Sequence, residues 1–218
     1  MKSVRYSATF GLLVLALAAM SLSMVGCSND DDDTTTTSPV PTLPTSGDAV
    51  VAAFETFYSE RDIDGYRALL HPNFKFLLDP TAPHTEDCLD YDTDTAIAAT
   101  MFSGHQGGIP GVIPITAIFI ASYPVSDWLP VPEYDSNFGG QQAQWREYTI
   151  NLLIQRENYG SFMISGPVSY YIVPIETREG GQTREVWQLL GQWDHTGNPG
   201  VTEEANWSEV KLLYQPTR

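Results

Sequence analysis

Hydrophobic residues between positions 48 and 71 recur at intervals of three and four, which is the period of an amphipathic helix. A first helix is predicted from about residue 48, with an apolar face made of Val50, Val51, Phe54, Phe57 and Tyr58. Asp62 is a good N-cap for a second helix, whose apolar face comprises Ile63, Tyr66, Leu69 and Leu70. Pro72 is expected to end that helix, because the residue before a proline is pushed out of the α region.

From residue 73 the hydrophobic period changes to two, which is typical of a strand. Phe74, Phe76 and Leu78 alternate with Asn73, Lys75 and Leu77, and the strand is expected to end at Asp79-Pro80. A third helix is predicted from Asp92 or Thr93 to Ser103, because its apolar residues again follow the helical period. Gly104 is expected to end this helix.

The remainder of the chain reads mostly as strands, at residues 115–123, 145–156, 161–175 and 185–194. Residues 124–140 are rich in proline and glycine, and they are expected to form an irregular insertion. Gly166-Pro167 is expected to break or bulge its strand. Trp187, Leu189 and Trp193 are expected to share one face of the last strand. Asn206 to Glu209 resembles a capping box and predicts a short closing helix, with inward-facing residues Trp207, Val210 and Tyr214.

Helices followed by a meander of antiparallel strands predict an α+β fold. Asp62-Ile63-Asp64-Gly65, the helix after it and the strand closing on Asp79-Pro80 resemble the opening of the SnoaL and ketosteroid-isomerase branches of the NTF2-like superfamily. The resemblance covers roughly residues 46–195. It implies three N-terminal helices packed in a curved antiparallel sheet, as a cone. This fold hosts isomerases, dehydratases, hydrolases, polyketide cyclases and many non-enzymes, so the fold does not decide the function.

The first 26 residues have the features of a secretory leader. Lys2 and Arg5 give a basic start, and the apolar run of residues 10–22 is too short for a comfortable membrane span. Met24-Val25-Gly26-Cys27 resembles the lipobox of bacterial lipoproteins, which implies cleavage before Cys27 and its lipidation. Residues 27–45 include a run of four aspartates, then a run of four threonines, then three prolines at positions 39, 41 and 44, so a disordered linker to a domain at residues 46–218 is expected.

The residues after the cysteine predict where the anchored protein resides. Ser28 stands where inner-membrane lipoproteins of enteric bacteria carry an aspartate. Cys27-Ser28-Asn29 followed by four aspartates also resembles the surface-export signal of Bacteroidetes lipoproteins. We therefore expect a lipid-anchored protein of the bacterial outer membrane that faces outward.

The chain is strongly acidic, with 11 Lys and Arg against 27 Asp and Glu, and a net charge of −16. Two basic residues and no acidic residue precede Cys27, so the mature chain has 9 basic and 27 acidic residues and a net charge of −18. This charge argues against nucleic-acid binding and permits a cationic ligand. The four histidines show no metal-binding spacing and there is no CxxC pair, so neither a metal nor another cofactor is expected.

The isomerase branch implies a carboxylate base near the end of the first strand and a phenol on the first helix. Asp79 matches the base. The phenol position falls on Phe54, which cannot donate a hydrogen bond, and Tyr58 lies one turn further along. Alternation places Asp79 on the face of Lys75 and opposite the apolar residues. The alternative interpretation is that Asp79, before a proline, is a turn residue.

His195 is the second candidate for acid–base chemistry. Its neighbour Asp194 points to the opposite face of a strand and cannot pair with it directly. A dehydratase of this fold would use a His–Asp pair from different strands, and His195 with Asp79 is one such pair; His71 is a further candidate. The alternative is that His195 is a surface histidine at a strand end.

Aromatic residues could line an apolar pocket inside the cone or form its core; they are Phe54, Tyr58, Tyr148, Tyr170, Tyr171, Trp187 and Trp193. Three functions remain open. The first is a non-catalytic module that binds a small apolar ligand or a protein partner. The second is an isomerase or dehydratase using Asp79 and His195, which needs an ionisable group inside the cone. The third is an assembly role, which needs an exposed apolar sheet face, for example in a homodimer.

Overall fold

The computed structural model describes residues 42–81, 87–104, 112–179, 181–196 and 206–216. The leader, Cys27 and the linker up to residue 41 lie outside the described residues. All described residues belong to one compact unit, Pro39–Arg218. Within this part of the chain, no helix has both the length and the hydropathy to cross a membrane.

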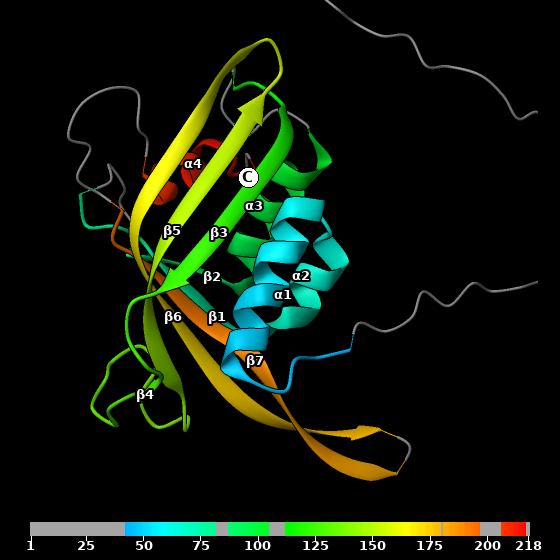
Figure 1. Ribbon diagram of the computed structural model, residues 1–218, viewed down its shortest axis with the longest axis vertical. Coiled ribbons are helices and arrows are strands. Elements are labelled where there is room, and N and C mark those ends of the chain that lie inside the picture. Colours follow the sequence, from blue (N-terminus) through cyan, green and yellow to red (C-terminus); the bar gives the residue numbers. More distant parts are fainter. Residues whose placement is uncertain (1–41, 82–86, 105–111, 180, 197–205, 217–218) are drawn as a thin grey trace, which may run out of the picture. The chain divides into compact units, whose positions relative to one another are not determined.

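The domain combines helices with one seven-stranded sheet of strand order β2-β1-β7-β6-β5-β3, and β4 pairs with β5. The helices are α1 (Gly47–Glu60), α2 (Ile63–Leu69), α3 (Tyr91–Ser103) and α4 (Trp207–Leu213). The strands are β1 (Leu70–Leu77), β2 (Cys88–Asp90), β3 (Ile115–Pro124), β4 (Leu129–Pro130), β5 (Gln144–Arg156), β6 (Tyr159–Glu179) and β7 (Gln182–Asp194). Figure 1 shows the sheet curving beside the helices, which confirms the α+β class and the three N-terminal helices.

The sheet is antiparallel, as expected, except for one pair of strands. β1 and β7 run parallel, with Phe76 beside Gln192 and Leu77 beside Trp193. Each hairpin of the meander reverses the chain, so the direction in which β7 meets β1 depends on the number of strands between them. The alternation of hydrophobic residues does not reveal that number.

Local capping signals set three helix ends as the sequence predicts. The expected end of the second helix at Pro72 is wrong, because α2 ends at Leu69 and β1 already begins at Leu70. The Asp62 side chain accepts hydrogen bonds from the backbone N–H groups of Asp64 and Gly65, 3.1 and 3.0 Å away, at the start of α2. Gly104 ends α3 in the left-handed conformation. The capping box of Asn206 and Glu209 starts α4. These groups satisfy backbone atoms that a helix end would otherwise leave unpaired.

The pairing of β6 with β7 contains one irregularity, which places Leu189 and Trp193 on opposite faces of the sheet and not on one face as predicted. The expected break at Gly166-Pro167 is wrong, since both residues pair with β5 without a shift. The irregularity lies instead between Tyr171 and Ile172 of β6, where Gly191 and Leu189 are the partners in β7. One extra residue in a strand reverses the faces of all residues after it. Leu189 is therefore buried on the inner face, whereas Trp193 lies on the outer face with 38% exposure.

The outer face of the sheet is covered over only part of its area. Residues 125–143 fold onto it and form a second core with β1, β6 and β7, comprising Leu77, Phe138, Ala143, Tyr171, Val173 and Leu190. The ring of Phe138 lies so close to Gly191 that an added Cβ would stand 2.3 Å from it. The irregular insertion predicted here thus forms a cover over one half of the outer face.

Candidate functional site

The interior of the cone is filled with aromatic side chains. Phe54 and Tyr58 of α1 are fully buried, with ring centroids 4.7 Å apart, and Tyr170 of β6 lies 5.6 Å from Phe54. Trp207 of α4 packs 5.9 Å from Phe54 and 6.0 Å from Tyr58. Three candidate pocket residues, Phe54, Tyr58 and Tyr170, are therefore members of the core around which α1 and α4 pack.

A buried ion pair next to these rings joins α3 and α4. The Lys211 ammonium contacts the Asp94 carboxylate, and both side chains are fully buried. The Tyr66 hydroxyl donates to the other Asp94 oxygen over 2.6 Å. Burial lowers the pKa of Lys211, and the Asp94 charge opposes this effect. The Lys211 ammonium also lies 4.2 Å from the centre of the Phe76 ring, which adds a cation–π contact.

This ion pair was not anticipated from the sequence, although one signal exists. Lys211 follows Trp207 by four residues and precedes Tyr214 by three, so it falls on the inward face of the closing helix. The pair supplies ionisable groups inside the cone, as the enzyme hypothesis requires. Since each charge is matched by the other and both side chains are fully buried in the aromatic core, their arrangement is that of a structural pair.

Four further polar atoms in this core have no hydrogen-bond partner among the described residues. They are the Tyr58 hydroxyl, the Trp207 indole N–H and both amide atoms of Gln192. Burial and the nearby Asp94 charge raise the pKa of Tyr58 well above its usual value, so the phenol stays protonated. It can offer a neutral hydroxyl but cannot act as a base.

Asp79 lies at the end of β1, where the chain turns. One of its carboxylate oxygens accepts hydrogen bonds from the Thr81 backbone N–H, at 2.7 Å, and from the Thr81 hydroxyl, at 2.5 Å. Its backbone N–H donates to the Ser208 hydroxyl of α4 over 2.9 Å. Asp79 is only 2% exposed. These are the contacts of a turn residue that also ties β1 to α4.

Asp194 and His195 lie on opposite faces at the end of β7. The Asp194 carboxylate points inward and accepts from the Ser208 backbone N–H and hydroxyl, at 2.7 and 2.6 Å, near the start of α4. The His195 ring lies on the outer face, with its Nε2 atom 3.4 Å from the Ser169 hydroxyl. Burial lowers the pKa of His195. His195 and Asp79 are therefore not brought together as a hydrogen-bonded pair.

The remaining pocket candidates are dispersed. The Tyr148 hydroxyl donates to Asp48 over 3.3 Å at the edge of the sheet, beside Arg146. Burial is the largest effect that raises the pKa of Tyr148 to about 12. Trp187 is partly buried against the main core, whereas Trp193 faces outward. The His71 pKa is lowered by burial, and its ring accepts from the Asn73 backbone N–H within the same strand.

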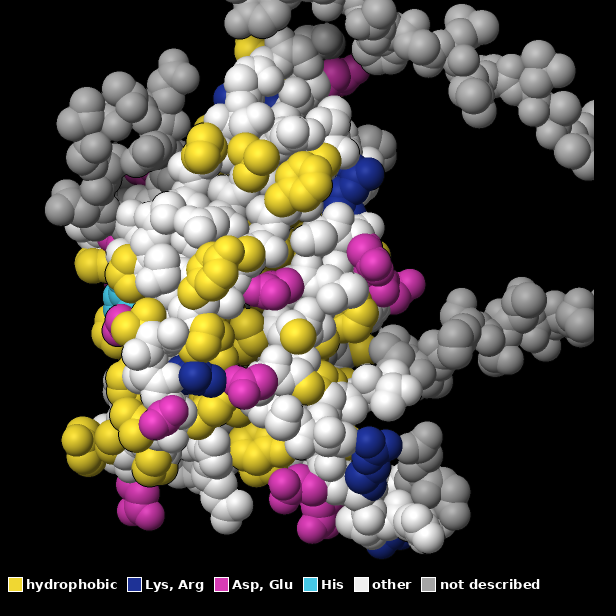
Figure 2. All heavy atoms as spheres, in the orientation of Figure 1, with side chains coloured by type: hydrophobic (Ala, Val, Ile, Leu, Met, Phe, Trp, Pro, Cys, Tyr) yellow, Lys and Arg dark blue, Asp and Glu magenta, His cyan; other side chains and the backbone are white. Residues whose placement is uncertain are grey.

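The uncovered half of the outer face carries a row of apolar side chains across three strands. Phe119 of β3, Leu153 of β5 and Met163 of β6 are in register, and Phe119 and Met163 are 53% and 64% exposed. Figure 2 shows a row of hydrophobic side chains across the upper part of this face without charges between them, whereas charged side chains lie among the hydrophobic ones lower down. The neighbouring row, made of Ala121, Asn151 and Ser165, contains smaller side chains. A hollow of about 330 Å³ lies there, beside the apolar row.

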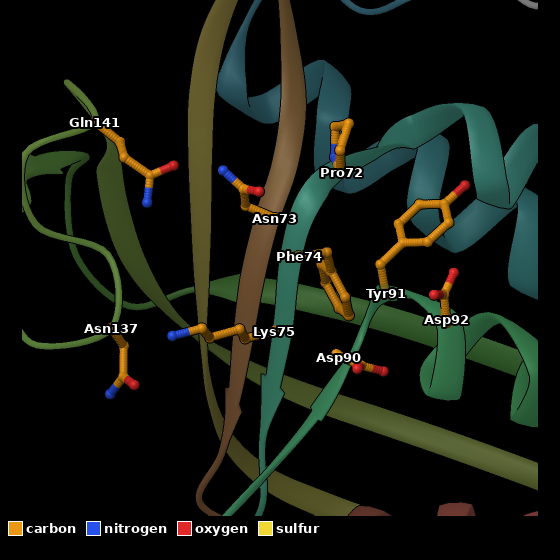
Figure 3. Close-up of a pocket in the computed structure, with 9 residues that line it drawn as sticks. All are labelled: Pro72, Asn73, Phe74, Lys75, Asp90, Tyr91, Asp92, Asn137 and Gln141. Carbon is orange, nitrogen blue, oxygen red and sulfur yellow. The ribbon is translucent and has the colours of Figure 1, made fainter.

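A second hollow, of about 410 Å³, lies between β1, the start of α3 and the cover. Figure 3 shows that the Lys75 side chain extends toward Asn137 and away from Asp90 and Asp92. The side-chain amides of Asn137 and Gln141 and the Lys75 ammonium line this hollow and can hold a hydrogen-bonding ligand, but they do not form an acid–base pair. Within the described ranges, no group of three or more His, Cys, Asp and Glu side chains is placed to hold a metal ion.

No model of a known protein family matches the sequence, and no curated protein matches it. Solved structures do show a likeness. A conserved protein from Planctomyces limnophilus has 10% identity and a TM-score of 0.44, covering 66% of this chain and 88% of that chain. An NTF2-like protein from Rhodospirillum rubrum has 10% identity and a TM-score of 0.38, covering 66% and 92%. A ketosteroid isomerase-like protein from Erwinia carotovora has 11% identity and a TM-score of 0.36, covering 67% and 89%. At these values the likeness carries no functional argument.

Proposed function

We propose that this chain is a lipid-anchored protein of the bacterial envelope whose domain is a non-catalytic binding module. The module associates through the uncovered half of its outer sheet face. The single observation that carries this proposal is the contrast between an interior closed by aromatic rings and an outer face that exposes Phe119 and Met163. Exposed apolar side chains in a contiguous row are a common mark of an interaction surface.

The interior supports a non-catalytic role. A general base must reach a proton on its substrate, but Asp79 is engaged by Thr81 and its turn lies against α4. Phe54 occupies the position where the isomerase branch needs a hydrogen-bond donor. Tyr58, the nearest phenol on the same helix, is fully buried among other rings.

The occupant that fits the uncovered face is a second copy of this chain. The apolar row lies beside a hollow lined by Ala121, Asn151 and Ser165, so a copy rotated by half a turn can place its row in that hollow. Such a two-fold contact uses one surface twice. The face carries no charge in these rows, which lets two acidic domains approach each other with their carboxylates at the rim.

Sedimentation of the lipid-free domain, residues 39–218, tests this association. We expect a reversible dimer that strengthens with added salt, because salt screens the repulsion between the acidic surfaces. Phe119→Asp and Met163→Asp should each give monomers, because a buried unpaired charge is costly. Tyr159→Asp is the matched control, since Tyr159 is exposed in β6 but outside the hollow. A wild-type domain that stays monomeric at high concentration would contradict the proposal.

A small apolar ligand in the hollow beside Phe119 is the second candidate, favoured by its apolar lining and its volume of about 330 Å³. The same domain can be screened by thermal shift with fatty acids and sterols. A ligand that stabilises the wild type but not Met163→Asp would favour this candidate over self-association.

The anchor and its location rest on residues 1–33, which lie outside the described residues. We expect Cys27→Ser to leave an unprocessed and unlipidated precursor, whereas the wild type carries a diacylglyceryl group and an acylated amino terminus. Mass spectrometry of the mature N-terminus measures this, and an unmodified Cys27 would refute lipidation. Protease treatment of intact cells should release the domain if it faces outward; cleavage only after lysis would refute that location.

A further inference from the structure

A pocket of about 350 Å³ lies on the outer face, where the cover formed by residues 125–143 meets β5, β6 and β7. Its floor is Ser169, a buried residue that pairs in register with Glu147 on one side and Trp193 on the other. The adjoining row places Trp145 beside Tyr171. This pocket is separate from the apolar hollow at Phe119, and its lining contains both aromatic rings and carboxylates.

The rings form two aromatic groups at this pocket. Trp145 and Tyr171 are stacked with centroids 6.4 Å apart, and Phe138 of the cover stacks on Tyr171 at 4.1 Å. Trp193 packs against His195 with their centroids 4.6 Å apart, and it keeps 38% of its surface exposed. Aromatic rings attract cations through their negative faces, and tryptophan does so most strongly.

The charges at this pocket are negative. Asp135 and Glu147 line it, and neither a lysine nor an arginine is among its lining residues. Asp135 accepts hydrogen bonds from the Asn137 and Phe138 backbone N–H groups, which fix its position in the cover. The Glu147 carboxylate has no hydrogen bond or ion pair with another described residue. Because burial lowers the pKa of His195, its imidazole is neutral at pH 7 and adds no positive charge.

We propose that this pocket binds an organic ammonium cation, with its alkyl groups against Trp145 and Trp193 and its charge beside Glu147. The proposal does not depend on self-association at the apolar row. It explains why a half-buried carboxylate, Glu147, lies among aromatic rings without a hydrogen bond or ion pair to another described residue: the ligand supplies the positive charge. The strong negative charge of the whole domain further favours a cation by raising its local concentration.

Calorimetric titration of the domain, residues 39–218, with choline tests this site. The neutral isostere 3,3-dimethylbutan-1-ol has the same shape without the charge, and we expect it to bind at least about tenfold more weakly. Glu147→Gln keeps the shape of the side chain and should weaken choline binding about fivefold or more, and Trp193→Ala should have a similar effect. Choline binding should also weaken as salt is added.

Two substitutions outside the pocket serve as matched controls. Glu185→Gln removes one charge elsewhere on β7, and Tyr134→Ala removes a 90% exposed ring from the cover; both should bind choline as the wild type does. Vesicles of phosphatidylcholine in a parallel titration separate the two sources of this chemistry. Binding to the vesicles would identify the ligand as a lipid headgroup. Binding to free choline alone would identify it as a soluble ammonium compound. Either outcome supports the proposal.

Three results would overturn it. The first is no saturable binding of choline up to tens of millimolar. The second is equal binding of choline and its neutral isostere, which would make the site merely apolar. The third is unchanged binding in Glu147→Gln, with a near-ultraviolet circular dichroism spectrum that shows the variant to be folded.

Discussion

The two faces of the sheet differ in what covers them. The inner face lies against α1 and α4, and its largest side chains, among them Tyr58, Tyr170 and Trp207, have no exposed surface. The outer face is covered over one half by residues 125–143 and left open over the other, where Phe119 and Met163 reach solvent. The concave side, where a substrate would enter a cone, is thus filled by packed side chains. The binding that we propose is therefore assigned to the convex side.

The largest expected effect comes from unpairing the charges of the inner face. Asp94→Asn leaves the Lys211 ammonium buried without its counter-charge and should lower the free energy of unfolding by about 3–5 kcal/mol. Urea unfolding measures the loss. The double variant Asp94→Leu, Lys211→Met removes both charges and should recover most of it. A loss below about 1 kcal/mol for Asp94→Asn would show that water reaches the pair and that the interior is open.

A smaller effect is expected where the cover meets the sheet. Gly191→Ala places a Cβ within 2.3 Å of the Phe138 ring and should cost about 1–3 kcal/mol by overpacking. Gly160→Ala is the matched control, because nothing lies within 4 Å of its added Cβ. Thermal unfolding of both variants compares the sites. If Gly191→Ala were as stable as Gly160→Ala, the cover would be loosely attached, and the pocket that it bounds would lose its wall.

Two tyrosines of the inner face provide a matched pair. Tyr66→Phe removes a hydrogen bond to the Asp94 carboxylate and should cost about 1.5–3 kcal/mol. Tyr58→Phe removes a buried hydroxyl that has no partner among the described residues, so the stability should stay the same or rise by about 1 kcal/mol. Urea unfolding separates the two. A large loss for Tyr58→Phe would reveal an ordered water or ligand at that hydroxyl.

The uncovered half of the outer face should contribute little to the stability of a monomer. Met163→Ser and Phe119→Ser, measured at a concentration where the domain is monomeric, should change the free energy of unfolding by less than about 0.5 kcal/mol. Ile164→Ser, which faces the other way from the same strand and is 2% exposed, is the control and should be strongly destabilising. Similar losses in the free energy of unfolding for Met163→Ser and Ile164→Ser would show that the two faces contribute equally to stability.

The smallest effect is expected at Asp79. Asp79→Asn retains an oxygen that can accept from Thr81, so both self-association and choline binding should stay as in the wild type. The same variant can be screened for turnover on small carbonyl and hydroxyl compounds. Wild-type turnover that falls a hundredfold or more in a folded Asp79→Asn domain would favour the enzyme hypothesis instead.

The sequence predicts those parts of the fold whose causes are local. Asp62, Gly104 and the pair Asn206–Glu209 act within a few residues of their own helix ends, so their roles are legible from spacing alone. The alternation of β5 is equally local, and its predicted inner face, from Tyr148 to Ile154, is buried as expected.

The candidate sites were harder to predict because they depend on contacts between distant segments. The extra residue at Leu190 moves Trp193 to the outer face, and no periodicity before it announces the shift. The aromatic pocket also needs residues 125–143 to fold back onto the sheet, and Phe138 stands among polar residues and glycines in an irregular stretch, without a hydrophobic period around it. The buried partnership of Asp94 and Lys211 spans 117 positions, and charged residues are expected at the surface when each is considered alone.

The same long separations bear on the export across a membrane that we propose for this chain. Asp79 and Ser208 are 129 positions apart, and the Gln188 amide that ties β7 to Ala68 bridges 120. A polypeptide threaded through a pore from its N-terminal end delivers β1 long before β7, one of the two strands that pair with it. Contacts of this range form slowly, so the core cannot close early and jam the pore. The emerging portion must meanwhile be shielded, because its apolar rows stay open to aggregation until α4 is delivered.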